Sequence, residues 1–256
     1  MMKTTKDIRI AVLIDADNIP STNIKGMMEE IAKYGTPTFK RIYGDWTKPN
    51  LISWKGVLLE NAITPIQQYG YTTGKNSTDS AMIIDAMDIL YTEKVDGFCI
   101  VSSDSDFTRL ATRLREAGMI VIGLGEKKTP NPFIVACDKF IYLEILNVPT
   151  VQFKDRAGAG KERKPAKEIQ KETLQKVHND TINLISTTIT DLADDSGWAF
   201  LGEVGNLILK KQPDFDPRNF GFGKLAPLIK SIGKFEIDER ETDRKTGKLV
   251  YVRVKG

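Results

Sequence analysis

The sequence is poor in the residues that usually organise small metal-bound or disulfide-bonded domains, with one histidine and two cysteines in 256 residues. Zinc sites and disulfide frameworks need clusters of these residue types, so the composition argues against both. Cys99 and Cys137 both stand among apolar neighbours, which predicts buried, reduced thiols. His178 stands far along the chain from the acidic motifs described below, and we expect it to be a surface or packing residue.

Long apolar runs are also missing. No run approaches the roughly 20 residues that a membrane-spanning helix needs, and the first seven residues lead into a short apolar strand rather than the core of a signal peptide. We therefore expect a soluble cytoplasmic protein without a membrane partner. The 37 basic and 34 acidic residues leave a net charge of only +3, so any charge that attracts a partner must be local.

The N-terminal part of the chain alternates between strand and helix patterns. Its first apolar run, at residues 10–14, ends abruptly in acidic residues, as is typical of a strand buried on both faces of a parallel sheet. Further strand patterns follow at residues 38–43, 63–69, 97–103, 119–124 and 140–145, and helical apolar stripes separate them. This alternation predicts an α/β domain over residues 1–150, with a mainly parallel sheet and helices on both faces.

Acidic residues stand where several of these elements meet the carboxyl edge of the predicted sheet. They are Asp15 and Asp17, Asp45, and Asp104 with Asp106 after strand patterns, and Asp79 at the start of a helix. Because parallel strands deliver their carboxyl ends to one edge, we expect Asp15, Asp79 and Asp104 to share a pocket. At about 100° per residue, Asp79 lies on the apolar side of its helix, whereas Asp85 and Asp88 are expected to face solvent.

Carboxylates crowded at one edge repel each other, and a divalent cation relieves that cost most simply. Oxygen ligands of this kind suit Mg²⁺ or Mn²⁺. The expected chemistry is metal-assisted hydrolysis of a phosphodiester, which requires no histidine. The simpler interpretation of Asp15 and Asp17, taken alone, is that they cap the next helix.

The remainder of the chain predicts a linker and a second, smaller domain. Residues 151–171 contain glycines, a proline and an excess of Lys and Arg, which indicates a flexible basic linker; it serves either as a plain tether or as a nucleic-acid contact. Residues 172–256 show three helical patterns followed by two strand patterns. That order is typical of a winged-helix-like α+β domain.

Four acidic segments resemble the NYN domains of the PIN-like nuclease superfamily: residues 14–18 (IDADN), Asp45, residues 76–79 (NSTD) and residues 101–107 (VSSDSDF). The resemblance covers roughly residues 8–147 and implies a PIN-like sheet and ribonuclease activity that depends on Mg²⁺ or Mn²⁺. Its catalytic, metal-binding acids would fall on Asp15, Asp79 and Asp104. Two more metal-binding acids, Asp45 and Asp106, and the polar cleft residues Asp17, Asn18 and Ser103 would complete the site.

Two segments of the C-terminal domain, residues 197–205 (GWAFLGEVG) and 215–225 (FDPRNFGFGKL), resemble the OST-HTH or LOTUS domain. The resemblance implies RNA binding and, in some members, a protein partner. We expect Phe215, Phe220 and Phe222 to be core aromatic residues. The basic residues Lys75, Arg218 and Lys224 are the better candidates for contacts with RNA phosphates.

Two alternatives to the ribonuclease remain open. The spacing of Asp15 and Asp17 also occurs in haloacid-dehalogenase-type phosphatases, although Asn18-Ile19-Pro20 follows where those enzymes usually have a hydroxyl residue, and Asp79 has no role in that scheme. A non-catalytic RNA-binding regulator with the same two domains is the stronger competitor, since acidic residues alone do not establish turnover. Phosphate-binding loops of the Walker type are absent from the sequence.

Overall fold

The computed structural model describes residues 7–69, 77–146, 177–241 and 248–255. The chain divides into two compact units, Met1–Asn147 and Val148–Gly256. The predicted basic linker at residues 151–171 lies outside the described residues, as does Lys75. No helix in the described part of the chain is both long and apolar enough to cross a membrane.

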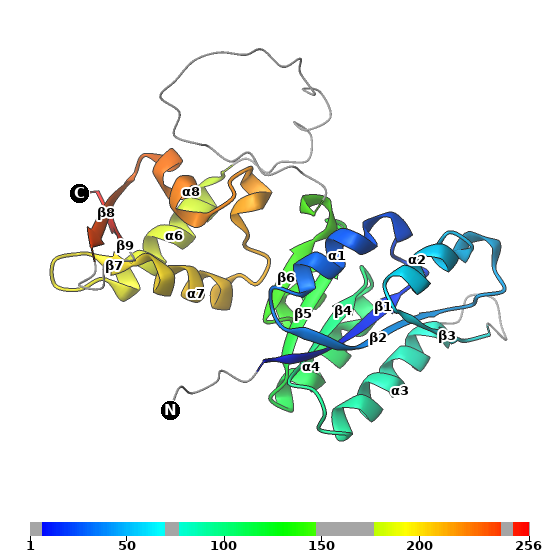
Figure 1. Ribbon diagram of the computed structural model, residues 1–256. Coiled ribbons are helices and arrows are strands. Elements are labelled where there is room, and N and C mark those ends of the chain that lie inside the picture. Colours follow the sequence, from blue (N-terminus) through cyan, green and yellow to red (C-terminus); the bar gives the residue numbers. More distant parts are fainter. Residues whose placement is uncertain (1–6, 70–76, 147–176, 242–247, 256) are drawn as a thin grey trace, which may run out of the picture. The chain divides into compact units, whose positions relative to one another are not determined.

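A six-stranded sheet with the order β3-β2-β1-β4-β5-β6 forms the centre of the N-terminal unit (Figure 1). Every neighbouring pair in it is parallel, which confirms the predicted α/β fold. The strands are β1 (Arg9–Asp15), β2 (Thr36–Gly44), β3 (Thr64–Gln67), β4 (Gly97–Val101), β5 (Ile120–Gly125) and β6 (Lys139–Tyr142). All five residues of β4 are buried, as expected for a central strand covered on both faces.

Helices cover both faces of this sheet (Figure 1). α1 (Ile24–Ile31) and α2 (Trp54–Glu60) pack on one face, and α3 (Ser77–Tyr91), α4 (Thr108–Glu116) and α5 (Asn131–Ala136) pack on the other. Short 3₁₀ turns connect these elements: η1 (Ser21–Asn23), η2 (Pro49–Leu51), η3 (Ser105–Phe107) and η4 (Leu143–Ile145). Successive side chains of β1 alternate between the two cores because neighbouring strand residues point to opposite faces.

One local prediction in this unit is wrong. Asp85 does not face solvent: its carboxylate accepts hydrogen bonds from the guanidinium of Arg41 and the hydroxyl of Tyr43. α3 packs against β2 closely enough for that strand to supply both partners, which the angular argument on a single helix does not include.

The predictions for Asp88 and for the two cysteines are confirmed. Asp88 is exposed on α3. Cys99 and Cys137 are buried free thiols, and burial raises the pKa of Cys137 to about 12, so it stays protonated at neutral pH. Neither thiol is available as a thiolate ligand or nucleophile.

The described residues of the C-terminal unit form three α-helices and a three-stranded antiparallel sheet in the order β7-β9-β8. Its elements are α6 (Asn179–Leu192), β7 (Ala199–Phe200), α7 (Leu201–Lys211), the turn η5 (Pro217–Phe220), α8 (Leu225–Ile232), β8 (Phe235–Glu241) and β9 (Lys248–Val254). The predicted helices and hairpin strands are present. Sequence analysis missed β7, because its two residues are too few to show an alternating pattern.

Gly123 on β5 tests the packing in the core between the sheet and α5. A Cβ atom at this position would lie 2.5 Å from Cδ2 of Phe140 and 2.8 Å from Sγ of Cys137. We predict that Gly123→Ala lowers the free energy of unfolding by about 1–3 kcal/mol, as overpacking in a core usually does. Urea denaturation followed by circular dichroism measures it.

The matched control is Gly56→Ala on α2, where a Cβ atom would meet no other atom within 4 Å. Alanine is the better helix former, so this variant should be unchanged or more stable by up to about 1 kcal/mol. Equal stability of the Gly123 variant and the wild type would contradict the described packing.

Candidate functional site

Asp15 is a buried carboxylate held in one orientation at the end of β1. Only 1% of its surface is exposed. Its carboxylate accepts hydrogen bonds from the backbone N–H of Asp17 (3.0 Å), the side-chain amide of Asn18 (2.7 Å) and the hydroxyl of Ser102 (2.8 Å). Burial raises the pKa of Asp15, and the three hydrogen bonds oppose that rise by stabilising the ionised form.

Ser102 connects the acidic end of β1 to that of β4. Its side chain is fully buried, and while its hydroxyl donates to Asp15, its oxygen accepts a hydrogen bond from the backbone N–H of Asp104 (3.0 Å). Asp104 in turn caps the turn η3, where its carboxylate accepts from the N–H of Asp106 (3.0 Å). One serine therefore fixes the relative positions of the Asp15 side chain and the Asp104 backbone.

Asp79 projects from the first turn of α3 toward the acids that follow β4. One carboxylate oxygen from each of Asp79, Asp104 and Asp106 lies within 4.8 Å of the others, a grouping that could hold a metal ion. Burial, and then the negative charges of Asp15, Asp104, Asp106 and Asp17, raise the pKa of Asp79 to about 6. A divalent cation fits this donor set, because its positive charge removes that repulsion and its preferred ligands are carboxylate oxygens.

Asp45 follows β2 and has internal hydrogen-bond partners. Its carboxylate accepts from the N–H and hydroxyl of Thr47 (3.3 and 2.6 Å) and from the side-chain amide of Gln67 (3.0 Å). These bonds tie the loop after β2 to the end of β3. Among the described residues, Asp45 is not part of the three-acid group.

Sequence analysis selected Ser103 as a cleft residue, but it is the neighbouring Ser102 that connects Asp15 and Asp104. Ser103 accepts a hydrogen bond from the backbone N–H of Glu126 (2.9 Å) and so joins the loop after β5 to the site. The strand pattern could have indicated Ser102. It directly follows Val101, the last residue of the buried strand β4, and therefore lies at the carboxyl end of that strand beside Asp15.

The predicted RNA-contacting residues of the C-terminal unit differ in their surroundings. Arg218 forms a two-point ion pair with Asp216, with nitrogen–oxygen distances of 3.0 and 2.7 Å, and its side chain is 20% exposed. Lys224, which precedes α8, is exposed. Phe215 is buried, and Phe220 packs against it with ring centroids 6.0 Å apart, in agreement with the expected core role.

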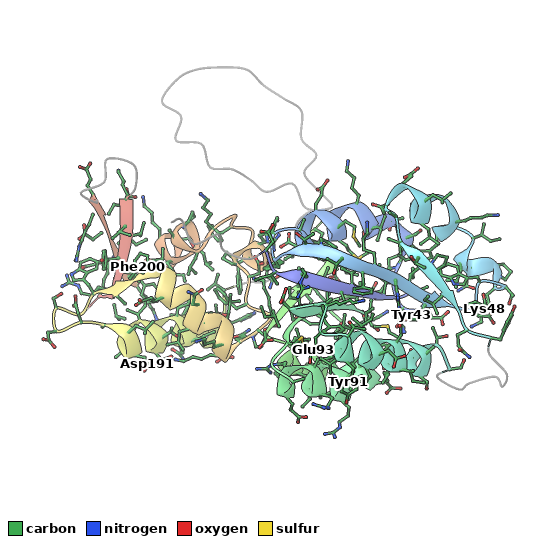
Figure 2. All side chains as sticks on the ribbon, turned by 60° about the horizontal axis from the view of Figure 1, so that its bottom comes forward. Tyr43, Lys48, Tyr91, Glu93, Asp191 and Phe200 are labelled. Carbon is green, nitrogen blue, oxygen red and sulfur yellow. The ribbon has the colours of Figure 1, made fainter. Side chains whose placement is uncertain are left out.

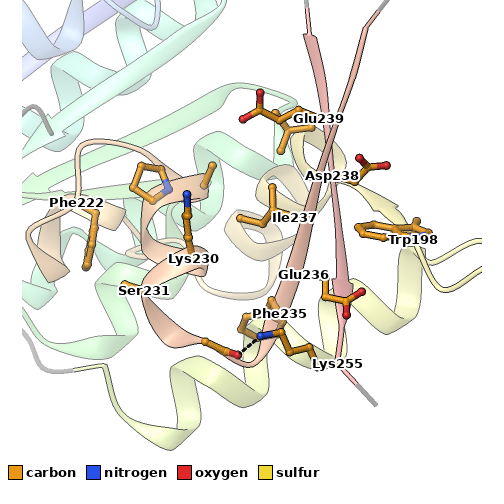
Figure 3. A pocket seen from close by; sticks show the side chains of 14 residues that line it. Trp198, Phe222, Lys230, Ser231, Phe235, Glu236, Ile237, Asp238, Glu239 and Lys255 are labelled. Atoms are coloured by element: carbon orange, nitrogen blue, oxygen red, sulfur yellow. Dashed lines mark hydrogen bonds between the residues drawn. The ribbon is translucent and has the colours of Figure 1, made fainter. Parts of the chain in front are cut away.

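A groove of about 1170 Å³ lies between α8 and β8 in the C-terminal unit (Figure 3). Apolar side chains such as Phe222 and Ile237 line it together with Lys230, Lys255 and three acids of β8. Lys255 donates a hydrogen bond to the carbonyl of Gly233 (2.8 Å). The mixed charge of this groove does not favour a polyanion such as RNA.

Comparisons with known proteins match both units. The NYN domain model matches residues 9–144, and the OST-HTH/LOTUS domain model matches residues 172–246. The six-stranded parallel sheet with flanking helices fits the PIN-like fold of NYN domains. No curated protein matches the chain significantly.

Solved structures of two uncharacterised proteins are similar to the chain. A protein of unknown function from Vibrio parahaemolyticus RIMD 2210633 has 20% identity and a TM-score of 0.45, over 54% of this chain and 94% of that one. An uncharacterised protein from Nitrosomonas europaea has 34% identity and a TM-score of 0.30, over 39% of this chain and 92% of that one. The NYN match alone covers more than half of the chain, so the chain belongs to the NYN domain family and carries an OST-HTH/LOTUS domain after its NYN domain.

Proposed function

We propose that this protein is a metal-dependent ribonuclease that hydrolyses RNA phosphodiester bonds and uses its C-terminal domain to bind RNA. NYN domains are of the PIN-like nuclease type, and OST-HTH domains bind RNA. The observation that carries the proposal is the group of Asp79, Asp104 and Asp106 at the carboxyl edge of the sheet. With Asp15 beside them, these acids would hold Mg²⁺ or Mn²⁺. When bound, such an ion supplies Lewis acidity and neutralises charge on the phosphate.

The surrounding residues prepare the acids for this role. Asn18 and Ser102 fix the orientation of Asp15, and Ser102 also holds the backbone of Asp104. These contacts hold the two acids in place, and preorganised charge of this kind is an effective contribution to catalysis.

The competing proposal is an RNA-binding regulator that does not cut its ligand. Asp45 supports it in part, because its hydrogen bonds to Thr47 and Gln67 leave one predicted metal ligand engaged elsewhere. Purified protein incubated with single-stranded, duplex and hairpin RNA, in Mg²⁺, Mn²⁺ or EDTA, separates the two. Binding without cleavage in every metal would favour the regulator.

Removing one charge from the acidic group should abolish cleavage. We predict that Asp104→Asn lowers kcat/KM for metal-dependent RNA cleavage by at least about 100-fold, equivalent to about 2.7 kcal/mol of lost transition-state stabilisation. The amide keeps the shape of the side chain, so the thermal unfolding temperature should change little. Asp88→Asn on the exposed face of α3 is the control and should cleave like the wild type. Equal loss in both variants would place the site elsewhere.

The raised pKa of Asp79 makes the effect of metal depend on pH. Since its pKa is about 6 rather than the ordinary 3.8, the folded protein binds this proton more tightly than the unfolded chain. The free energy of unfolding therefore decreases as pH rises from 3.8 to about 6, and at pH 7.5 the ionised carboxylate of Asp79 destabilises the fold. We predict that Mn²⁺ raises the unfolding temperature more at pH 7.5 than at pH 5.0, as measured by differential scanning fluorimetry.

Asp79→Asn removes the same negative charge, so it should reproduce part of the stabilisation by Mn²⁺ when no metal is added. We expect it to raise the metal-free unfolding temperature at pH 7.5 by about 1–3 °C, a modest value because Asp79 is partly solvated, and to reduce the shift caused by Mn²⁺. A Mn²⁺-induced shift that is the same in wild type and variant would show that Asp79 does not contact the ion.

The C-terminal domain should govern RNA affinity rather than the chemical step. We predict that removing residues 172–256 weakens RNA binding and makes it less sensitive to salt, by about 0.7 in the log–log slope for each lost phosphate contact. At saturating RNA the cleavage rate should stay close to that of the full chain, because the acids all belong to residues 1–150. Unchanged affinity and slope after truncation would indicate that this domain binds a protein partner instead.

A further inference from the structure

Lys48 places a positive charge beside the acidic site, on the loop that follows β2. The backbone of this loop is fixed: the N–H of Lys48 donates to the carbonyl of Asp45 (2.9 Å), and its own carbonyl accepts from the N–H of the buried Leu51 (3.3 Å). The Lys48 side chain is 49% exposed, and its Nζ lies 3.9 Å from Oδ1 of Asp17. A lysine with this half-open environment keeps donors available for a ligand.

A second lysine flanks the site on the side of β5. The loop after this strand is joined to the site by the hydrogen bond between the N–H of Glu126 and the hydroxyl of Ser103, and it is closed by Thr129, whose N–H and hydroxyl donate to the carbonyl of Glu126. Lys128 lies in this loop with its side chain 67% exposed, and its Nζ is 2.5 Å from the carboxylate of Glu126.

The strand order sets the spacing between the ends of the two strands that precede these lysines. β2 and β5 are separated by β1 and β4, so their carboxyl ends lie three strand spacings apart, or about 14 Å at roughly 4.8 Å per strand. The acids that follow β1 and β4 lie between them. A few nucleotides of an extended RNA strand span such a distance, and their phosphates need positive partners because the acids between the lysines repel them.

We propose that a single RNA strand crosses the carboxyl edge of the sheet at right angles to the strands, with phosphates on either side of the cleaved one contacting Lys48 and Lys128. The position of the cleaved bond rests on the proposed ribonuclease function, whereas the two phosphate contacts do not. The path explains why positive side chains stand on both sides of a group of acids that by itself would repel RNA. It also favours a single strand, since the ends of the four strands from β2 to β5 span only about 14 Å.

Alanine substitutions in the full-length protein test this path. Lys48→Ala and Lys128→Ala should each raise KM for single-stranded RNA by about 3–10-fold and leave kcat within about twofold. Each should also reduce the log–log salt slope of RNA binding by about 0.7, measured by fluorescence anisotropy with Ca²⁺ in place of Mg²⁺. Arginine at either position should restore most of the slope, because it supplies the same charge.

The matched control is Lys94→Ala. Lys94 is exposed and precedes β4, so it lies at the amino edge of the sheet, opposite the acids. Figure 2 shows its neighbour Glu93 and Lys48 at widely separated places on the N-terminal unit. The control removes the same charge and should leave KM and the salt slope unchanged.

Three outcomes would overturn the proposal: unchanged KM and slope in both variants, an equal change in Lys94→Ala, or a change in kcat and in the Mn²⁺-induced thermal shift with KM unaltered. The last result would assign Lys48 to the acids rather than to RNA. Wild-type protein that cleaves no RNA in Mg²⁺ or Mn²⁺ would refute the ribonuclease function alone, and the binding slopes would still decide whether the two lysines contact phosphates.

Discussion

The cost of keeping several carboxylates at one edge of the sheet is the constraint on which the N-terminal domain depends. A carboxylate as buried as Asp15 is tolerated only when hydrogen bonds replace its lost hydration, and Asn18, Ser102 and the backbone of Asp17 provide them. At Asp79, burial and the crowding of negative charge together raise the pKa. The arrangement therefore has a cost in free energy that positive charge nearby would reduce.

The apolar layers make this arrangement rigid. β1 and β4 lie between two hydrophobic cores and contribute side chains to both. Because these side chains are closely packed, the strands cannot readily shift to relieve the repulsion at their ends. α3 carries Asp79, and the contacts of Asp85 with Arg41 and Tyr43 tie that helix to β2. Polar contacts in the middle of a helix therefore help to determine where an acid in its first turn can lie.

Sequence patterns were sufficient to predict the layers of the fold, but not the side-chain contacts between one element and another. The apolar runs identify β1 and β4 because a strand buried on both faces admits little else, and the acids after them follow from the shared direction of parallel strands. Asp85 shows the limit: periodicity describes one helix at a time, whereas its environment depends on β2, some forty residues earlier. The role of Ser102 was likewise hidden, since it depends on a contact with β1, 87 residues away.

Ser102 also restricts how this site can evolve. One hydroxyl donates to the carboxylate of Asp15 and accepts from the backbone of Asp104, so a change at this position alters two acids on two strands at once. Among the common side chains, threonine alone keeps a hydroxyl on the same carbon, and its extra methyl group must then fit a space with no solvent exposure. Changes at the two acids are therefore coupled through Ser102, a residue outside the proposed set of metal ligands, and both its hydroxyl and its packing limit what can replace it.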